Sequence, residues 1–187
     1  MPTQRKILFA GATGQLEGML HLPDAAPRGV AVVAHPLPSV GGTMDNKVVT
    51  TLAKAFVEFG FATLRFNFRG VGESAGSYDH GNGETLDAIA AANFMRSEFP
   101  DLPLLSAGFS FGGYVQACAA DRTRPQQMVL IAPAVGRFAM PHVPGNTLLV
   151  HGDLDEVVEL DAVLTGRARS ICPSWCWREQ GISSTGG

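Results

Sequence analysis

The pentapeptide Gly108-Phe109-Ser110-Phe111-Gly112 predicts a sharp turn between a buried strand and a helix. An apolar run, Leu102 to Ala107, precedes it, and a stretch of small residues, Gly113 to Ala120, follows it. Two glycines flank the serine because such a turn is strained and because the helix must pass close to the strand. The pentapeptide alone is a weak signal, but its place between a strand and a helix makes it specific.

Predicted strands and helices alternate along the rest of the chain. Runs with strand character cover Lys6 to Ala10, Leu16 to Leu22, Gly29 to Ala34, Phe61 to Phe68, Gln127 to Ile131 and Thr147 to Val150. Helical spacing places four residues on the apolar face of one helix: Val49, Leu52, Ala53 and Phe56. A second helix is predicted from Glu84 to Phe99, with four residues on its inward face: Leu86, Ile89, Ala90 and Phe94. The order predicts one α/β domain, with a mostly parallel sheet and helices on both faces.

A glycine-rich turn near the N-terminus offers an alternative interpretation. Lys6 to Gly18 resembles the strand and turn that open a dinucleotide-binding fold, which would make the protein a nucleotide-binding oxidoreductase. The fingerprint requires a glycine three places after Gly14, however, and position 17 is a glutamate. The stretch from Leu16 to Leu22 also has strand character, so no helix N-terminus would face a pyrophosphate. We therefore favour a β-hairpin here.

The composition is that of a globular protein and narrows the classes of partner. Hydrophobic residues make up 45% of the chain and charged residues 17%, and the net charge of −3 gives no reason to expect nucleic acid or an anionic membrane as a partner. Three cysteines do not form a disulfide framework, and the N-terminal segment is too short and interrupted for a signal peptide or a membrane span. We expect a cytoplasmic protein.

Several further motifs follow one another in a recognisable order. They are His35-Pro36-Leu37-Pro38, Gly41 to Lys47, Asn67-Phe68-Arg69-Gly70-Val71-Gly72-Glu73-Ser74, the Ser110 pentapeptide, and His151-Gly152-Asp153-Leu154-Asp155. Together they resemble the small, cap-less serine α/β-hydrolases of esterase or thioesterase type, which are relatives of the dienelactone hydrolases. The resemblance extends from about Lys6 to Leu164. It implies an acyl-transfer hydrolase that cleaves small carboxylic esters or thioesters without a cofactor or a metal.

Ser110 is the expected nucleophile, and it needs both a base and an oxyanion hole. One oxyanion donor is expected to be the backbone N–H of Phe111, the residue after the nucleophile. The other should come from the loop after the strand that ends at Ala34. Because Pro36 has no N–H, Leu37 is the first residue there that can donate.

Asp155 is the expected acid of the triad. It follows the end of a buried strand, where ligands meet parallel sheets, and in the family pattern the aspartate at this spacing orients the histidine. Asp153 is the competing candidate for this role. The alternative interpretation is that both aspartates are solvated turn residues with no role in catalysis. Arg69 and Glu73 are expected to hold their glycine-rich loop by ion pairing rather than to touch the substrate.

The histidine that should follow the acid is missing, because no histidine follows His151 in the 187 residues. Residues 165–187 carry a net charge of +2 against −5 for the remainder, hold both tryptophans, and show neither strand nor helix periodicity. We therefore divide the chain into an incomplete hydrolase domain, residues 1–164, and an aberrant tail, residues 165–187, with the last strand and helix of the fold missing. Restoring one base after Leu164 opens a hypothetical frame that contains a short strand ending in Gly-Thr-Gly-His, so a frameshift is our preferred explanation.

Two functional hypotheses follow from these residues. The first is a serine hydrolase with a small-molecule acyl substrate, impaired in this chain because the triad histidine is absent; if such a chain were fully active, His35 would be the first candidate for a substitute base. The second is a catalytically inactive protein of the same fold that binds a small acyl ligand or a protein partner. A missing last strand would also leave an apolar sheet edge, through which we expect self-association.

Overall fold

The computed structural model describes residues 3–135 and 137–152. Its elements in chain order are β1 (Thr3–Ala10), β2 (Gln15–Leu22), β3 (Gly29–Ala34), a short 3-10 turn (Pro38–Val40), α1 (Lys47–Glu58), β4 (Phe61–Phe66), α2 (Asn82–Glu98), β5 (Leu104–Phe109), α3 (Phe111–Thr123), β6 (Gln127–Ile131) and β7 (Thr147–Val150). Asp153, Asp155 and the predicted tail lie outside the described residues. Within those described ranges, no helix has the length and apolar character needed to cross a membrane.

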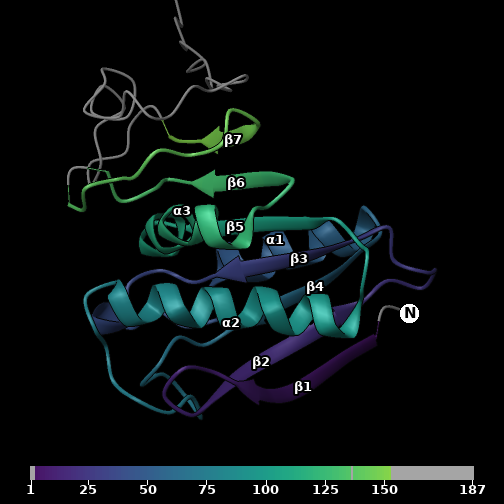
Figure 1. Cartoon of the computed structure of the whole chain (residues 1–187), viewed down its shortest axis with the longest axis horizontal. Coiled ribbons are helices and arrows are strands. Elements are labelled where there is room, and N and C mark those ends of the chain that lie inside the picture. The colour runs from purple at the N-terminus through teal and green to yellow at the C-terminus, as the bar shows by residue number, and fades with distance from the viewer. Residues whose placement is uncertain (1–2, 136, 153–187) are drawn as a thin grey trace, which may run out of the picture.

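One seven-stranded sheet organises the molecule (Figure 1). Its strand order is β1-β2-β4-β3-β5-β6-β7; β1 and β2 form an antiparallel hairpin, β2 is antiparallel to β4, and every other neighbouring pair is parallel. All six residues of β3 are buried, as expected for a strand covered on both faces. The predicted α/β fold with a mostly parallel sheet is therefore confirmed.

The N-terminal glycine-rich stretch forms the turn of the hairpin. Gly11 N donates to Gly14 O over 2.8 Å, and β2 follows directly, paired with β1 along its whole length. No helix begins at this turn, so the feature that a dinucleotide site needs is missing here. The hairpin interpretation is confirmed.

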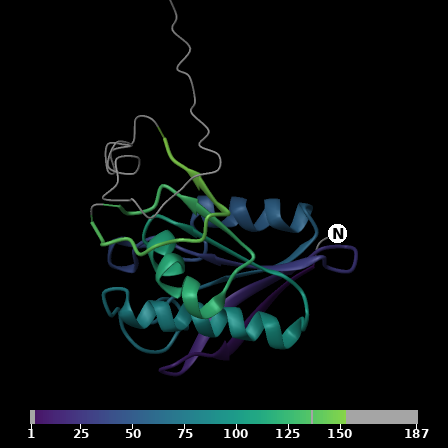
Figure 2. The ribbon, with the colours of Figure 1, turned by 45° about the horizontal axis from the view of Figure 1, so that its top comes forward.

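Helices cover both faces of the sheet, and the two faces have separate cores (Figures 1 and 2). Helices α2 and α3 pack side by side on one face, where Phe66 of β4 and Phe68 of the loop after it are buried. Helix α1 covers the other face, where Val49 and Phe56 contact Val33 and other small apolar residues of β3, β5 and β6. The carboxyl ends of the parallel strands therefore all point the same way, to the left in Figure 1.

Helix α2 presents a different face to the core from the one that its larger apolar residues predict. Leu86 is 39% exposed, and Ala90 and Phe94 are only partly buried, so the predicted inward set was wrong in part; Ile89 alone of the four is buried. The buried face carries Ala88, Ala91, Ala92 and Met95, together with the charged residues Glu84 and Asp87. Asp87 lies on the same face as the small residues and pairs with the buried Arg69, so the ion pair and the small-residue stripe face the core together.

Strand β4 is shorter than predicted, ending at Phe66 instead of Phe68. The next two residues stay buried but make different contacts from a sheet ladder. The side chain of Asn67 bonds polar groups on both sides, and Phe68 N donates to the His35 ring. The end of this strand therefore begins the loop that the next section describes.

Candidate active site

Ser110 lies at the sharp turn between β5 and α3, as the pentapeptide predicts. Its backbone has φ 54° and ψ −116°, a left-handed conformation that is uncommon for a residue other than glycine. The serine is partly exposed, whereas Phe111 directly after it is buried. A strained, accessible residue between a buried strand and a buried helix is what a serine nucleophile of this fold requires.

The two glycines of the pentapeptide are needed for close approach of the backbone. A Cβ atom at Gly108 would lie 2.3 Å from Gly112 O, and one at Gly112 would lie 2.4 Å from Ala34 O and 2.6 Å from His35 O. Contacts this short with backbone atoms cannot be relieved by moving a side chain. The glycines therefore let α3 start directly against β5 and against the end of β3.

Hydrogen bonds tie the turn to the neighbouring strand. Ser110 N donates to Ile131 O over 2.9 Å, and Ser110 O accepts from Gly113 N over 3.0 Å. Ala134 N also approaches the same carbonyl, at 3.4 Å. The serine is therefore held between the ends of β5 and β6, which stabilises its unusual backbone conformation.

The two predicted oxyanion donors lie on loops that follow adjacent strands. Phe111 N begins α3, and Leu37 N lies three residues after β3, which pairs with β5. Neither N–H donates to another group within the part of the chain that the structure describes. Both remain available to a substrate oxygen, and their role as an oxyanion hole stays a prediction.

His35 is part of the scaffold, which corrects its candidacy as a substitute base. Its side chain is fully buried, its Nδ1 lies 2.6 Å from Pro36 O, and its Nε2 accepts from Phe68 N over 3.1 Å. Because Nε2 is an acceptor, Nδ1 carries the proton and donates to the carbonyl. Burial lowers the pKa of His35 to about 4, against the opposing effect of the Pro36 hydrogen bond. Both ring nitrogens are engaged, so His35 cannot accept a proton from Ser110.

The other histidines near this edge of the sheet differ in accessibility. His151 follows β7 directly and is buried, whereas His80 and His142 are exposed loop residues. The exposed positions of His80 and His142 agree with their place in short, polar connections. The predicted acid Asp155 and its competitor Asp153 lie outside the described residues, so their roles stay predictions.

The loop after β4 is held by two ion pairs, as predicted from its charges. Arg69 binds Asp87 of α2 through both ends of its guanidinium, with Nε–Oδ2 at 3.0 Å and Nη2–Oδ1 at 2.8 Å, and both side chains are buried. The hydrogen bond with Asp87 raises the pKa of Arg69. Glu73 pairs with Lys6 of β1 at 2.6 Å. The expectation that Arg69 and Glu73 hold this loop is confirmed.

Aromatic residues from two loops and from α3 gather around Phe111, a feature that sequence reasoning missed. Its ring lies within 6.0 Å, centroid to centroid, of four other aromatic rings, those of Phe68, Tyr78, Tyr114 and Phe138. Tyr114 and Phe138 stack at 4.6 Å, and burial is the main cause that raises the pKa of Tyr114 to about 12. Because Phe68, Tyr78 and Phe138 are far from Phe111 in the sequence, no local pattern indicates that they meet. The cluster packs around the residue that directly follows Ser110.

Metal ligands do not converge in the described residues, where no group of three or more His, Cys, Asp or Glu side chains is placed to hold an ion. Cys118 of α3, the one cysteine that the described ranges include, is a free thiol, and burial raises its pKa.

Comparisons with known proteins identify relatives over most of the chain. A family model described as "Serine aminopeptidase, S33" matches residues 25–144. An uncharacterised protein of Rickettsia prowazekii (strain Madrid E) is 33% identical over 175 residues, which is 84% of this chain and 70% of the relative.

Solved structures agree with this result. An α/β serine hydrolase without a lid from Xanthomonas campestris is 40% identical, with a TM-score of 0.87 over 94% of this chain and 83% of the other. An α/β serine hydrolase homologue from Coxiella burnetii is 38% identical, with a TM-score of 0.87 over 95% of this chain and 87% of the other.

Proposed function

The chain belongs to the serine aminopeptidase, S33, family of α/β hydrolases, and we propose that its own reaction is the cleavage of small carboxylic esters or thioesters through an acyl-enzyme on Ser110. The observation that carries this proposal is the backbone of Ser110, whose φ of 54° presents the residue at the turn between β5 and α3. Such strain persists only where the surrounding structure imposes it, and it is concentrated at functional sites.

The expected reaction proceeds in two steps. Ser110 Oγ attacks the carbonyl carbon while a base takes its proton, and the carbonyl oxygen becomes an oxyanion that Leu37 N–H and Phe111 N–H stabilise. The tetrahedral intermediate then expels the alcohol or thiol, which receives the proton, and leaves an acyl-serine. Water repeats the sequence on the acyl-serine, releasing the carboxylic acid and restoring Ser110.

The present sequence does not supply the base that this reaction needs. Asp155 would orient a histidine later in the chain, yet no histidine follows His151 among the 187 residues. Loss of the triad histidine lowers turnover by roughly 10⁶-fold in a well-studied serine protease, subtilisin, with residual catalysis from the oxyanion hole. We therefore propose that this 187-residue chain acylates slowly.

The open surroundings of Ser110 favour small substrates. The connection between β6 and β7, residues 132–146, is too short to form a separate cap domain, and the relative from Xanthomonas campestris is described as a hydrolase without a lid. The aromatic residues around Phe111 would contact the apolar part of an acyl group. A cytoplasmic location remains a prediction from the cysteine content.

The missing histidine also favours a second candidate function. A protein with this fold and an unactivated serine would bind a small acyl ligand or a protein partner without turning it over. The two candidates differ in the reactivity of Ser110: an impaired hydrolase, with its oxyanion donors in place, still reacts slowly with a fluorophosphonate, whereas the serine of a binding protein does not react above background.

A labelling experiment on the purified chain tests the proposal. We expect a fluorophosphonate to modify the protein at Ser110, Ser110→Ala to abolish the label, and Ser97→Ala, a change on the exposed side of α2, to leave it unchanged. Hydrolysis of p-nitrophenyl acetate, an acyl thioester and an aminoacyl p-nitroanilide would then define the bond that is cleaved. A label that persists in Ser110→Ala would contradict the assignment of Ser110 as the nucleophile, and no label at all would favour the binding protein.

A further inference from the structure

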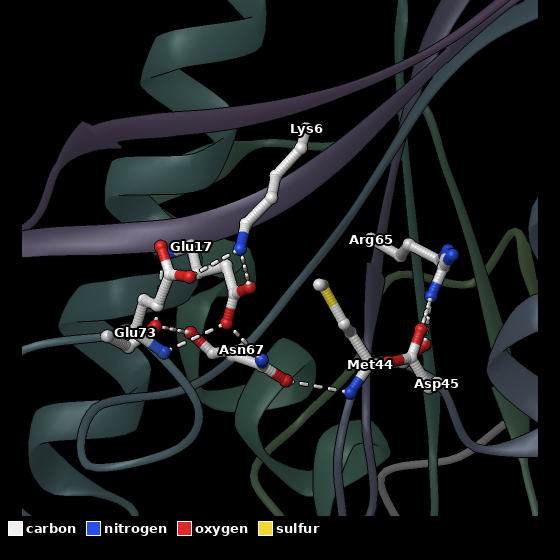
Figure 3. A network of polar contacts seen from close by, with 8 residues as sticks. Lys6, Glu17, Met44, Asp45, Arg65, Asn67 and Glu73 are labelled. Atoms are coloured by element: carbon white, nitrogen blue, oxygen red, sulfur yellow. Dashed lines mark hydrogen bonds and ion pairs between the residues drawn. The ribbon is translucent and has the colours of Figure 1, made fainter.

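We propose that Asn67 is a positioning residue, oriented by the Glu17 carboxylate, that fixes the loop carrying Leu37. The inference rests on the proposed function, because Leu37 is the expected oxyanion donor. Asn67 follows β4, Glu17 lies in β2, and the loop from His35 to Asn46 joins β3 to α1. Figure 3 shows the side chains between these three segments.

The Asn67 amide lies between a hydrogen-bond donor and a hydrogen-bond acceptor. Its Oδ1 accepts from Met44 N over 2.8 Å, and its Nδ2 donates to Glu17 Oε2 over 2.8 Å (Figure 3). The side chain is buried, so water does not substitute for either contact. A flipped amide would place its NH₂ group against the Met44 N–H and its oxygen against a carboxylate. The carboxylate and the N–H therefore select a single orientation.

Glu17 is itself held as an anion. Its Oε2 also accepts from Glu73 N over 2.9 Å, and its Oε1 pairs with Lys6 Nζ at 2.9 Å. Burial raises the pKa of Glu17, but the hydrogen bonds from Glu73 N, Lys6 and Asn67 outweigh it and lower the pKa overall. Lys6 also reaches Glu73 Oε1, so hairpin and loop share one network (Figure 3).

The Met44 peptide transmits this restraint to the oxyanion loop. Its N–H is held by Asn67, and its carbonyl accepts from Arg65 Nη1 over 2.9 Å. Two residues earlier, Gly42 N donates to Leu37 O over 3.0 Å, and a Cβ atom at Gly42 would lie 2.2 Å from Pro36 O. Because Gly42 packs directly on the Leu37 peptide, a shift of Met44 displaces the Leu37 N–H as well.

Replacing Asn67 by aspartate tests the orientation with almost no change of shape. The new Oδ1 still accepts from Met44 N, but the other oxygen faces Glu17 Oε2. Because the two carboxyl groups are adjacent, the state in which both are ionised is disfavoured. The charged groups on one side of this pair are Lys6 of β1 and Glu73 of the loop after β4. Arg65 and Asp45 lie on the other side, next to the loop from His35 to Asn46. Protonation of one carboxyl in acid restores a hydrogen bond between residues 17 and 67, so the defect should be reversed by acid.

Two readouts separate this inference from the proposed function. The first is the rate of fluorophosphonate labelling at Ser110, which we expect to fall about 10- to 100-fold in Asn67→Asp near neutral pH, the range for a donor misplaced by about 1 Å. The second is amide hydrogen exchange in residues 36–44, compared with the unmodified chain at the same pH, which does not require an active enzyme. We expect faster exchange there near neutral pH and a return toward the unmodified rate in acid.

A paired variant and a matched control complete the experiment. Glu17→Gln combined with Asn67→Asp places an amide donor opposite the new carboxylate but gives up the Glu73 N hydrogen bond to Oε2, so both readouts should move part of the way back toward the unmodified chain at neutral pH. Asn93→Asp, on the exposed side of α2, should change neither. If the unmodified chain is not labelled, the proposed function fails and hydrogen exchange alone decides this inference. Equal exchange in Asn67→Asp and the unmodified chain near neutral pH would overturn it.

Discussion

Three buried polar residues define what single side chains do in this protein. His35, Asn67 and Arg69 are each buried and hydrogen bonded, and each connects a loop near Ser110 to the sheet or to α2. A buried polar group without partners would cost about 1–3 kcal/mol, so these contacts specify the loops more than they add net stability. The loops around the serine are therefore positioned by hydrogen bonds from these buried polar side chains.

His35 carries a prediction about pH. Its pKa is about 4 in the folded chain and 6.5 in its ordinary state. Above pH 6.5 the histidine is neutral in both states, whereas below it only the unfolded chain takes up the proton, so the free energy of unfolding falls between pH 6.5 and 4. The expected loss from this residue is about 3 kcal/mol.

Urea unfolding at several pH values checks this expectation. His35→Gln, whose amide can still donate to Pro36 O and accept from Phe68 N, should lower the dependence of the unfolding free energy on pH. His142→Gln replaces an exposed histidine and should leave the dependence unchanged. His21, whose pKa is lowered to about 4 by burial and then by Arg65, contributes in the same window and stays present in both variants. Equal pH dependence in the two variants would contradict the assignment.

At the scale of elements, the turn between β5 and α3 depends on backbone contact. The β5 strand, the first turn of α3 and the end of β3 approach so closely that neither Gly108 nor Gly112 has room for a methyl group. The same closeness places the first N–H groups of α3 near the loop after β3. Packing of three backbone segments, and not any side chain, therefore builds the frame of the candidate site.

Gly112→Ala tests this dependence. The added methyl would lie 2.4 Å from Ala34 O, so we expect the free energy of unfolding to fall by about 1–3 kcal/mol or more, the range for overpacking in a rigid core. Gly145→Ala is the control, because a Cβ atom at Gly145 meets nothing within 4 Å. Chemical denaturation of both variants gives the comparison, and an equal effect of the two changes would argue against the close approach.

At the scale of the whole molecule, the sheet has two edges with different chemistry. Strand β1 lies at one end and carries exposed charged residues, including Arg5 and Lys6, which discourage pairing with another chain. Among the described strands β7 lies at the other end, with the short apolar sequence Thr147–Val150. We therefore predict that self-association uses the β7 side of the sheet.

The predicted self-association is tested on the 187-residue chain. We expect sedimentation to show concentration-dependent oligomers, and Leu148→Lys in β7 to reduce them because a charge on an edge strand disfavours pairing. Leu8→Lys in β1, where the leucine is 47% exposed, is the control and should leave association unchanged. A monomer at all concentrations would contradict the prediction.

The sequence by itself determined the order of strands and helices and the place of Ser110, because hydrophobic periodicity and a glycine-flanked turn are local properties. It also identified the loop-holding roles of Arg69 and Glu73, since their charges follow a strand directly. It did not indicate which face of α2 is buried, the engagement of both His35 nitrogens, or the aromatic residues around Phe111.

Those features were decided by the tertiary structure, because each depends on partners far apart in the chain. Asp87 on the buried face of α2 pairs with Arg69, and Phe68 N donates to the ring of His35. The bridge from Glu17 through Asn67 to Met44 joins three segments that come together only when β2 and β4 pair. Hydrogen-bond partners of buried polar groups are set by the folded arrangement, which no local pattern encodes.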